Sequence, residues 1–197
     1  MDREEALNLL KKYVKNKNLI KHSLAVEAIM RELALDLDKK NNANVNVFLD
    51  NSHNEEKWAL AGLVHDIDYE DTADDPLRHS LVAEKILTEY GFDEDIIYAV
   101  KVHNEVHGFP LKNDMDIALF ASDPISGLIV ASALIKPERK LESIDTDFVM
   151  KRYKEKSFAK GANRKQMLSC ENLGYSLDEF IAISLNAMKK IAQEIGL

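Results

Sequence analysis

The stretch ALAGLVHDID, residues 59–68, is an almost uninterrupted apolar helix that ends in a His-Asp pair. The apolar run predicts burial, so it carries His65 and Asp66 into the interior, where an uncompensated carboxylate is costly. A divalent metal would compensate that charge, because imidazole and carboxylate groups are the usual ligands of Mn, Fe, Co, Ni and Zn. Adjacent helical residues point about 100° apart, so the pair shares an ion only at a helix end or with ligands from other helices.

Other imidazole and carboxylate groups interrupt the neighbouring predicted helices. His22 lies on an amphipathic segment upstream, and Asp123 stands in an apolar stretch where a plain core would carry Leu or Ala. His79 opens one downstream helix after the Asp-rich turn 71–75, and His103 lies near the end of the next helix. In an antiparallel helix pair the positions of His79 and His103 adjoin.

The rest of the chain is helical by its apolar period. Only 7 Gly and 4 Pro punctuate 197 residues, and strict apolar–polar alternation is rare. We expect one all-α domain, residues 1–197, in which Asp123-Pro124 breaks or kinks a helix and the Asn-rich residues 40–54 form a surface connection with a solvated His53. The expected helices cover about 4–15, 18–39, 55–67, 79–90, 93–106, 114–135, 145–156, 163–170 and 176–195, the first and last starting with capping boxes.

Composition excludes several classes of protein. With 26 Lys and Arg against 34 Asp and Glu, the net charge of −8 argues against bulk nucleic-acid binding. The single Cys170 excludes a disulfide framework and any zinc site of paired thiols, which fits a reducing compartment. The N-terminus lacks the pattern of a signal peptide, and the longest apolar stretch, 127–135, is shorter than the roughly 20 residues of a membrane span. We therefore expect a cytoplasmic protein without a membrane partner.

The ordered set of His22, His65-Asp66, His79, His103 and Asp123 resembles the HD superfamily of metal-dependent phosphohydrolases. The motif core spans about residues 18–135, and the helical extension at about 145–195, together with KSFAKGANR at 156–164, resembles the tail of a group of uncharacterised predicted HD hydrolases. The resemblance implies an HD-type helical bundle with additional C-terminal helices. It also implies one metal on His22, His65, Asp66 and Asp123, and in many members a second on His79 and His103.

One departure from the family concerns the residues after the His-Asp pair. Many dinuclear relatives continue with Ile-Gly, whereas this chain continues with Ile67, Asp68, Tyr69 and Glu70. We expect Asp66 to bridge two divalent transition-metal ions; the alternative is a single ion, with His79 and His103 acting directly on substrate phosphate. Asp68 would either hydrogen-bond outer-shell water or transfer protons. For proton transfer, no spacing argument chooses among Asp68, Glu70 and Glu105.

A cationic segment at 156–165 stands out in this acidic chain. Lys160 and Arg164 flank Gly161 near an expected helix start, where ammonium, guanidinium and backbone N–H groups would together bind phosphate. The alternative is a solvated basic surface. His107, four residues after His103, precedes Gly108-Phe109-Pro110, which indicates that the helix has already ended.

These features favour a phosphohydrolase that acts on a nucleotide or another small phosphorylated metabolite, with a metal-activated water as nucleophile. Two other classes remain as alternatives. An HD-type di-iron oxygenase would use a similar ligand set, and oxygen uptake would distinguish it. A regulatory module would keep the metal as a structural element without catalysis. The sequence does not specify the oligomeric state.

Overall fold

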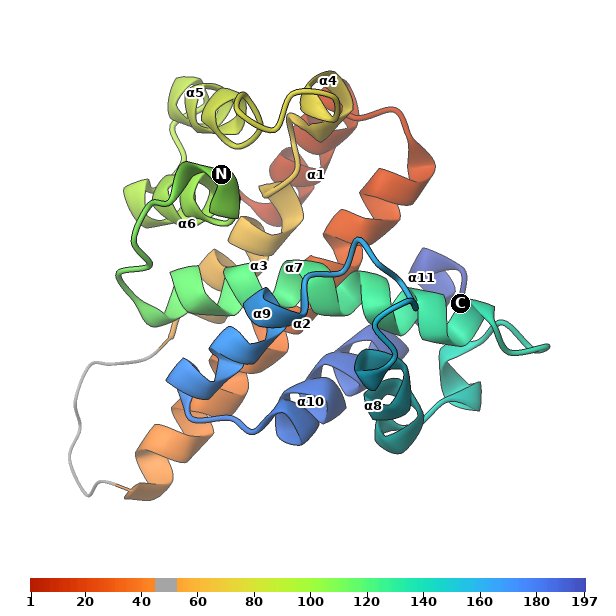
Figure 1. The fold of residues 1–197 in the computed structure, drawn as a ribbon. Coiled ribbons are helices and arrows are strands. Elements are labelled where there is room, and N and C mark those ends of the chain that lie inside the picture. Colours follow the sequence, from red (N-terminus) through yellow and green to blue (C-terminus); the bar gives the residue numbers. More distant parts are fainter. Residues whose placement is uncertain (45–52) are drawn as a thin grey trace.

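The computed structural model describes residues 1–44 and 53–197. The expected all-α fold is confirmed, because the described residues form α-helices and short 3-10 helices and no strand. Figure 1 shows their arrangement. The α-helices are α1 (Arg3–Tyr13), α2 (Lys17–Asn44), α3 (Glu55–Val64), α4 (Tyr69–Thr72), α5 (Leu81–Glu89), α6 (Glu94–Val102), α7 (Asp114–Leu134), α8 (Thr146–Lys154), α9 (Arg164–Met167), α10 (Leu177–Lys190) and α11 (Ala192–Ile195), with 3-10 helices η1 (Glu105–His107), η2 (Leu141–Ser143) and η3 (Leu168–Leu173).

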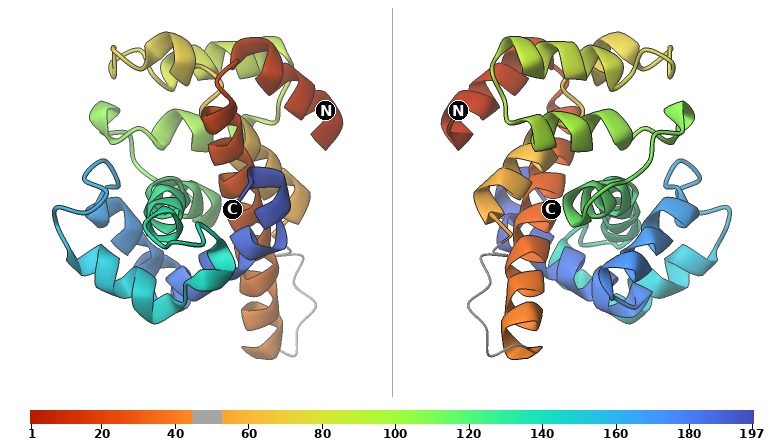
Figure 2. Two further views of the ribbon diagram at one scale, coloured as in Figure 1. Left: turned by 90° about the vertical axis from the view of Figure 1, so that its right-hand side faces the viewer. Right: turned by 90° about the vertical axis from the view of Figure 1, so that its left-hand side faces the viewer.

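Helix α7 lies in the middle of the molecule, and α2, α6, α8, α9 and α10 pack against it (Figure 2). By length and composition α7 could cross a membrane, yet 61% of its most apolar window is buried inside the protein. The expected break at Asp123-Pro124 does not occur, since the helix continues through Pro124. Proline removes one backbone hydrogen bond. Burial of the flanking Ser122 and Ile125 within the core holds the helix together across that position.

Helices α2 and α3 approach each other closely at Gly62. A Cβ atom added to Gly62 would lie 2.8 Å from the Val26 carbonyl oxygen, so only glycine permits this approach. Val26 follows His22 by one turn of α2, and His65 follows Gly62 by three residues. The contact therefore sets the distance between two of the expected metal ligands.

The C-terminal helices join the same core as the motif helices. Helix α10 packs on α2 and α7, and the buried Phe180 belongs to one hydrophobic cluster with Leu10 of α1. The capping boxes predicted at Asp2 and Ser176 are both present. The expected helix 176–195 is interrupted at Ile191, and the expected helix 163–170 is a short α9 followed by η3.

His53 is not the solvated residue that the Asn-rich stretch suggested. Its side chain is only 14% exposed, and its Nδ1 lies 2.7 Å from Asp38 Oδ1 of α2. Its ring packs edge-on against Trp58. The polar composition around His53 gave no sign of these partners, because they come from two separate helices. Residues 45–52 of that stretch lie outside the described part of the chain.

Candidate metal centre

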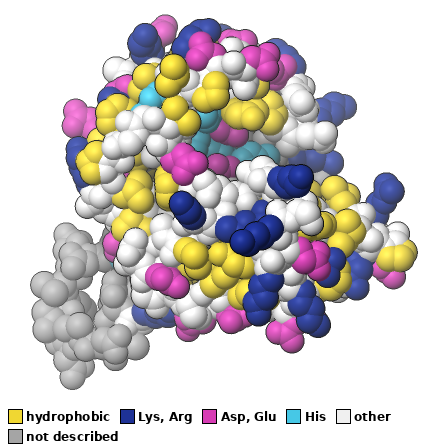
Figure 3. Space-filling model, viewed as in Figure 1, with side chains coloured by type: hydrophobic (Ala, Val, Ile, Leu, Met, Phe, Trp, Pro, Cys, Tyr) yellow, Lys and Arg dark blue, Asp and Glu magenta, His cyan; other side chains and the backbone are white. Residues whose placement is uncertain are grey.

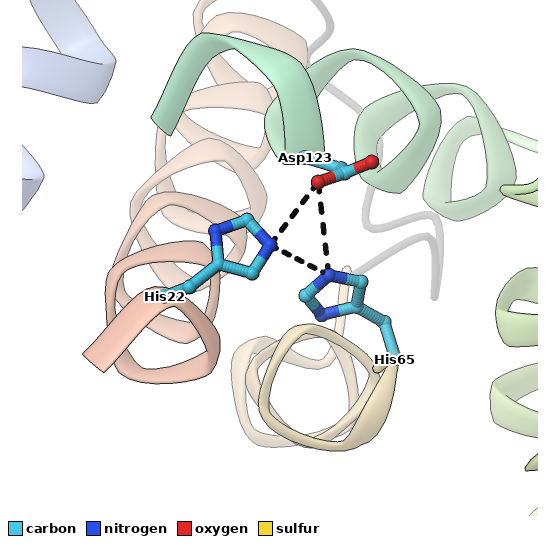
Figure 4. Close-up of side chains that lie close together, drawn as sticks. All are labelled: His22, His65 and Asp123. Carbon is cyan, nitrogen blue, oxygen red and sulfur yellow. Dashed lines mark hydrogen bonds and ion pairs between the residues drawn. The ribbon is translucent and has the colours of Figure 1, made fainter. Parts of the chain in front are cut away.

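Three helices bring His22, His65 and Asp123 to one point (Figure 4). His22 projects from α2, His65 follows the last residue of α3, and Asp123 projects from α7. The Nε2 atoms of His22 and His65 are 3.1 Å apart, and Asp123 Oδ1 lies 3.1 Å from the first and 3.8 Å from the second. Asp66 Oδ2 lies 3.5 Å from both Nε2 atoms.

These separations fit a shared metal ion. Neighbouring ligand atoms about 2.0–2.2 Å from one ion lie roughly 2.8–3.6 Å from each other in octahedral or tetrahedral geometry. Only the separation of 3.8 Å between Asp123 and His65 is slightly longer than this range. Two nitrogens and two carboxylate oxygens form the borderline donor set that first-row divalent ions prefer. The residues present therefore fit a divalent transition metal.

A second imidazole pair faces the other oxygen of Asp66. The Nε2 atoms of His79 and His103 are 3.2 Å apart. Asp66 Oδ1 lies 3.5 Å from the first and 3.6 Å from the second. The carboxylate of Asp66 thus stands between two pairs of imidazoles, with one oxygen directed at each pair.

Hydrogen bonds behind each ring fix which nitrogen faces the centre. His65 Nδ1 donates to the Gly62 carbonyl oxygen and His103 Nδ1 to the Val100 carbonyl oxygen. The Ser126 hydroxyl donates to the Asp123 carbonyl oxygen, so its oxygen is free to accept from His22 Nδ1. A neutral imidazole with its proton on Nδ1 presents an Nε2 lone pair, which is the form that binds metal.

Asp68 orients His79 in the same way. Its Oδ1 accepts from His79 Nδ1 at 2.9 Å, and its Oδ2 accepts from the backbone N–H groups of Ser80 and Ala83. The side chain is fully buried. The predicted proton-transfer role does not suit a carboxylate held by three donors away from solvent, and we assign Asp68 to positioning His79.

Mutual electrostatics stabilise the charged forms within the centre. Burial opposes ionisation of Asp66, but the imidazoles of His65, His103 and His22 hold the pKa of its carboxyl well below the usual range. Asp123 is affected in the same direction by His22 and His65. Burial also opposes protonation of His65, yet Asp66 and Asp123 raise its pKa. The pKa of His79 is raised against burial by Asp68 and Asp66.

The other predicted acids and His107 lie outside the ligand cluster. Glu70 Oε2 accepts from the backbone N–H groups of Lys15 and Asn16, in the connection between α1 and α2. These contacts join Glu70 to that connection rather than to the imidazole pairs. Glu105 Oε1 accepts from Asn163 Nδ2. His107 Nε2 donates to the His79 carbonyl oxygen and so braces the neighbouring turn.

Lys160 and Arg164 have different surroundings. Arg164 donates from Nε and both terminal nitrogens to backbone carbonyl oxygens of residues 153, 155, 158, 159 and 162. All five N–H groups are thereby used, so Arg164 organises the loop before α9 and has no donor left for the phosphate that the sequence suggested. Lys160 is exposed and lines a pocket of about 660 Å³ together with Lys154 and Lys156.

The chain matches the HD domain family over residues 19–134, which include every residue of the two imidazole pairs and both central carboxylates. It belongs to the HD domain family. Ribonuclease Y from two strains of Nitratidesulfovibrio vulgaris is 28% identical over 166 residues, 80% of this chain and 28% of the relative. An uncharacterised protein of Methanocaldococcus jannaschii is 35% identical over 103 residues, 52% of this chain and 54% of the relative. No solved structure gives a significant match.

The chain of this HD protein thus spans about a quarter to a half of the length of the curated relatives it matches. HD domains form a superfamily of metal-dependent phosphohydrolases, and the clustered His and Asp side chains could hold such a metal. Figure 3 shows these His and acidic side chains together in a hollow of the surface, with Lys and Arg side chains beside it.

Sequence reasoning missed three residues that support the HD centre. Ser126 contacts His22, as described above, and Gln166 Nε2 donates to the His103 carbonyl oxygen. The ring of Tyr69 packs edge-on against His79 at 5.2 Å between centroids. Burial, Asp66 and Asp123 raise the pKa of Tyr69, which keeps its hydroxyl protonated beside the centre. Only Tyr69 had a sequence signal, namely its place directly after the His-Asp-Ile-Asp segment.

We expect metal affinity to fall as pH is lowered from about 8 to about 6, by up to about tenfold per pH unit for each imidazole proton that the ion displaces. The raised pKa values of His65 and His79 mean that protons compete for the same Nε2 atoms at higher pH than for free imidazole. Calorimetric titration with Mn²⁺ in buffers of different ionisation enthalpy measures both affinity and proton release. Equal affinity at both pH values without proton release would contradict this expectation.

Proposed function

We propose that this HD protein is a phosphohydrolase that acts on the phosphoester or phosphoanhydride of a nucleotide or another small phosphorylated metabolite. The observation that carries the proposal is the Asp66 carboxylate between two imidazole pairs, each with its Nε2 atoms a little over 3 Å apart. A purely structural metal site is usually closed by its ligands. Here the side chains of His22 and Asp123 are 23% and 32% exposed, which leaves a path for water and substrate.

We further propose two ions, held by His22, His65, Asp66 and Asp123 on one side and by His79, His103 and Asp66 on the other. Bound ions of this kind lower the pKa of a coordinated water and neutralise charge on phosphoryl oxygens. The protein's own contribution is to direct the Nε2 atom of each imidazole at the centre and to keep Asp66 ionised. We also propose that Tyr69, whose ring packs against His79 and whose hydroxyl stays protonated, donates a hydrogen bond to a phosphoryl oxygen.

We propose that the basic loop before α9, residues 155–163, binds the substrate. Asn163 donates to Glu105 of η1, and Gln166 donates to the His103 carbonyl oxygen, so the loop is tied to the second imidazole pair. Lys160, Lys154 and Lys156 line its pocket. An acidic chain that collects ammonium groups beside a metal centre is suited to a small anionic substrate rather than to bulk nucleic acid.

Phosphate release tests the proposed reaction. Protein purified without chelator and supplied with Mn²⁺ should release phosphate or a nucleotide product in a screen over nucleotides, sugar phosphates and p-nitrophenyl phosphate. A short oligoribonucleotide is included because one relative is named a ribonuclease. Asp66→Ala should lose both metal and activity, whereas Asp71→Ala, an exposed acid in α4, should keep both. Wild-type activity in Asp66→Ala protein would contradict the proposal.

Metal titration tests the two-ion arrangement. Wild-type protein should saturate at two Mn²⁺ per chain, and the His79→Ala, His103→Ala double variant at one. Asp68→Asn should weaken the binding of one of the two ions by about 10- to 100-fold and leave the affinity for the other unchanged. The reason is that Asp68 contacts only His79 among the proposed ligands. Thermal melting of the metal-free variants checks that they are folded. Saturation at one ion in wild type, unchanged in the double variant, would leave only the first site.

Substitution of Lys160 tests the role of the basic loop. Lys160→Ala should raise KM by about tenfold and change kcat by less than about twofold, since an exposed ammonium group binds ground state and transition state alike. Lys165→Ala is the control, because Lys165 is exposed in the same segment and is not among the lining residues of the pocket. Unchanged kinetics in Lys160→Ala would favour the alternative that the loop is a solvated basic surface.

A further inference from the structure

A second pocket lies on the other flank of the first imidazole pair, and His22 forms part of its wall. Its volume is about 410 Å³, within the range of roughly 300–1,000 Å³ that is usual for small-molecule sites. Val130 and Leu134 of α7 together with Ile195 and Leu197 supply the apolar part of the remaining wall, and Lys21 and Asn18 supply its polar part. No step of the proposed reaction uses these residues.

The pocket adjoins the metal centre at His22, and two helices lead from the ligands to it. Asn18, at its rim, precedes His22 by one turn of α2, and Gly127 follows Asp123 by one turn of α7. One helical turn advances about 5.4 Å. A small molecule with a phosphoryl group at His22 and Asp123 therefore reaches the pocket with atoms roughly 5 Å from that phosphoryl group.

Gly127 lines this pocket without adding a side chain to it. Glycine inside a helix is destabilising relative to alanine, so a glycine at such a position usually has a packing or a functional reason. Gly62 has one, because α2 leaves no room for a Cβ atom there. A Cβ atom on Gly127 would meet nothing within 4 Å, so packing of the protein does not explain this glycine. The space that it leaves belongs to the pocket.

The apolar walls indicate the chemistry of the occupant. Leu134 is 47% exposed at the pocket, which leaves apolar surface in contact with water until something covers it. An inorganic phosphate or a short polyphosphate has no apolar surface to place there. An aromatic or aliphatic group attached to a phosphoryl group covers Val130 and Leu134 and gains from their desolvation.

We propose that this pocket binds the apolar part of an organophosphate whose phosphoryl group lies at the metal ligands, and that Gly127 sets the size of the group accepted. The proposal rests on the proposed phosphohydrolase function. It makes Gly127 a specificity-determining residue rather than a catalytic one.

Binding of two non-hydrolysable phosphonates tests the proposal without relying on turnover. Methylphosphonate and 2-naphthylmethylphosphonate are titrated by calorimetry into Mn²⁺-loaded wild type, Gly127→Ala and Gly127→Leu. The naphthyl compound should bind wild type at least about tenfold more tightly than methylphosphonate. Gly127→Leu should abolish that preference and leave methylphosphonate affinity unchanged, whereas Gly127→Ala, with its single methyl group, should retain most of it.

The other outcomes overturn the inference in distinguishable ways. Equal affinity of both phosphonates for wild type, or an unchanged preference in Gly127→Leu, overturns it and leaves the proposed function intact. Equal weakening of both compounds assigns Gly127 to the metal centre and also overturns it. If neither phosphonate binds any form of the protein, the proposed function loses its support and the inference fails with it. A wild-type dimer that dissociates in Gly127→Leu on size-exclusion chromatography assigns the pocket to a second copy of the chain instead.

Discussion

Four imidazole nitrogens directed at one buried carboxylate are the feature on which the rest of this structure depends. Lone pairs on Nε2 atoms 3.1 and 3.2 Å apart repel one another unless a cation stands between them. In all four histidines the Nδ1 atom, on the far side of the ring, makes a hydrogen bond that holds the ring in this orientation. Two of these contacts are to carbonyls of the preceding helical turn, one is to a hydroxyl and one is to the carboxylate of Asp68.

Close packing between helices fixes the positions of the ligands in that centre. The absence of a side chain at Gly62 lets α3 approach the backbone of α2, and this approach places His65 next to His22. Helix α7 passes through the core and delivers Asp123 from the other side. The C-terminal helices belong to the same hydrophobic cluster, so the extension beyond the family core helps to hold α7 in place.

Two pockets lie near the centre. The first is lined by Lys154, Lys156 and Lys160, and the loop that forms it is joined to His103 through Gln166 and is organised by the guanidinium of Arg164. The second has His22 in its wall, with Val130 and Leu134 as apolar neighbours and Lys21 as a polar one. The proposed substrate would place its phosphoryl group at the metal ligands and its apolar part in the second pocket.

The sequence alone was sufficient for the features that depend on neighbours within one helix. Apolar periodicity marked the helices, capping boxes at Asp2 and Ser176 marked two helix starts, and polar residues interrupting apolar runs singled out the six side chains that the structure brings together. These signals are local, because a helical turn relates residues only three or four positions apart.

The tertiary structure alone decided the tasks of residues whose partners are distant in the chain. Asp68 and Glu70 look equivalent in sequence, yet the first is held by His79 and two backbone N–H groups and the second by a connection 54 and 55 residues away. Arg164 could have faced an anion or the backbone, and Gly127 could have been a packing glycine like Gly62. Composition and period cannot distinguish such cases, because a hydrogen bond or a steric contact depends on what another element places within about 3–4 Å.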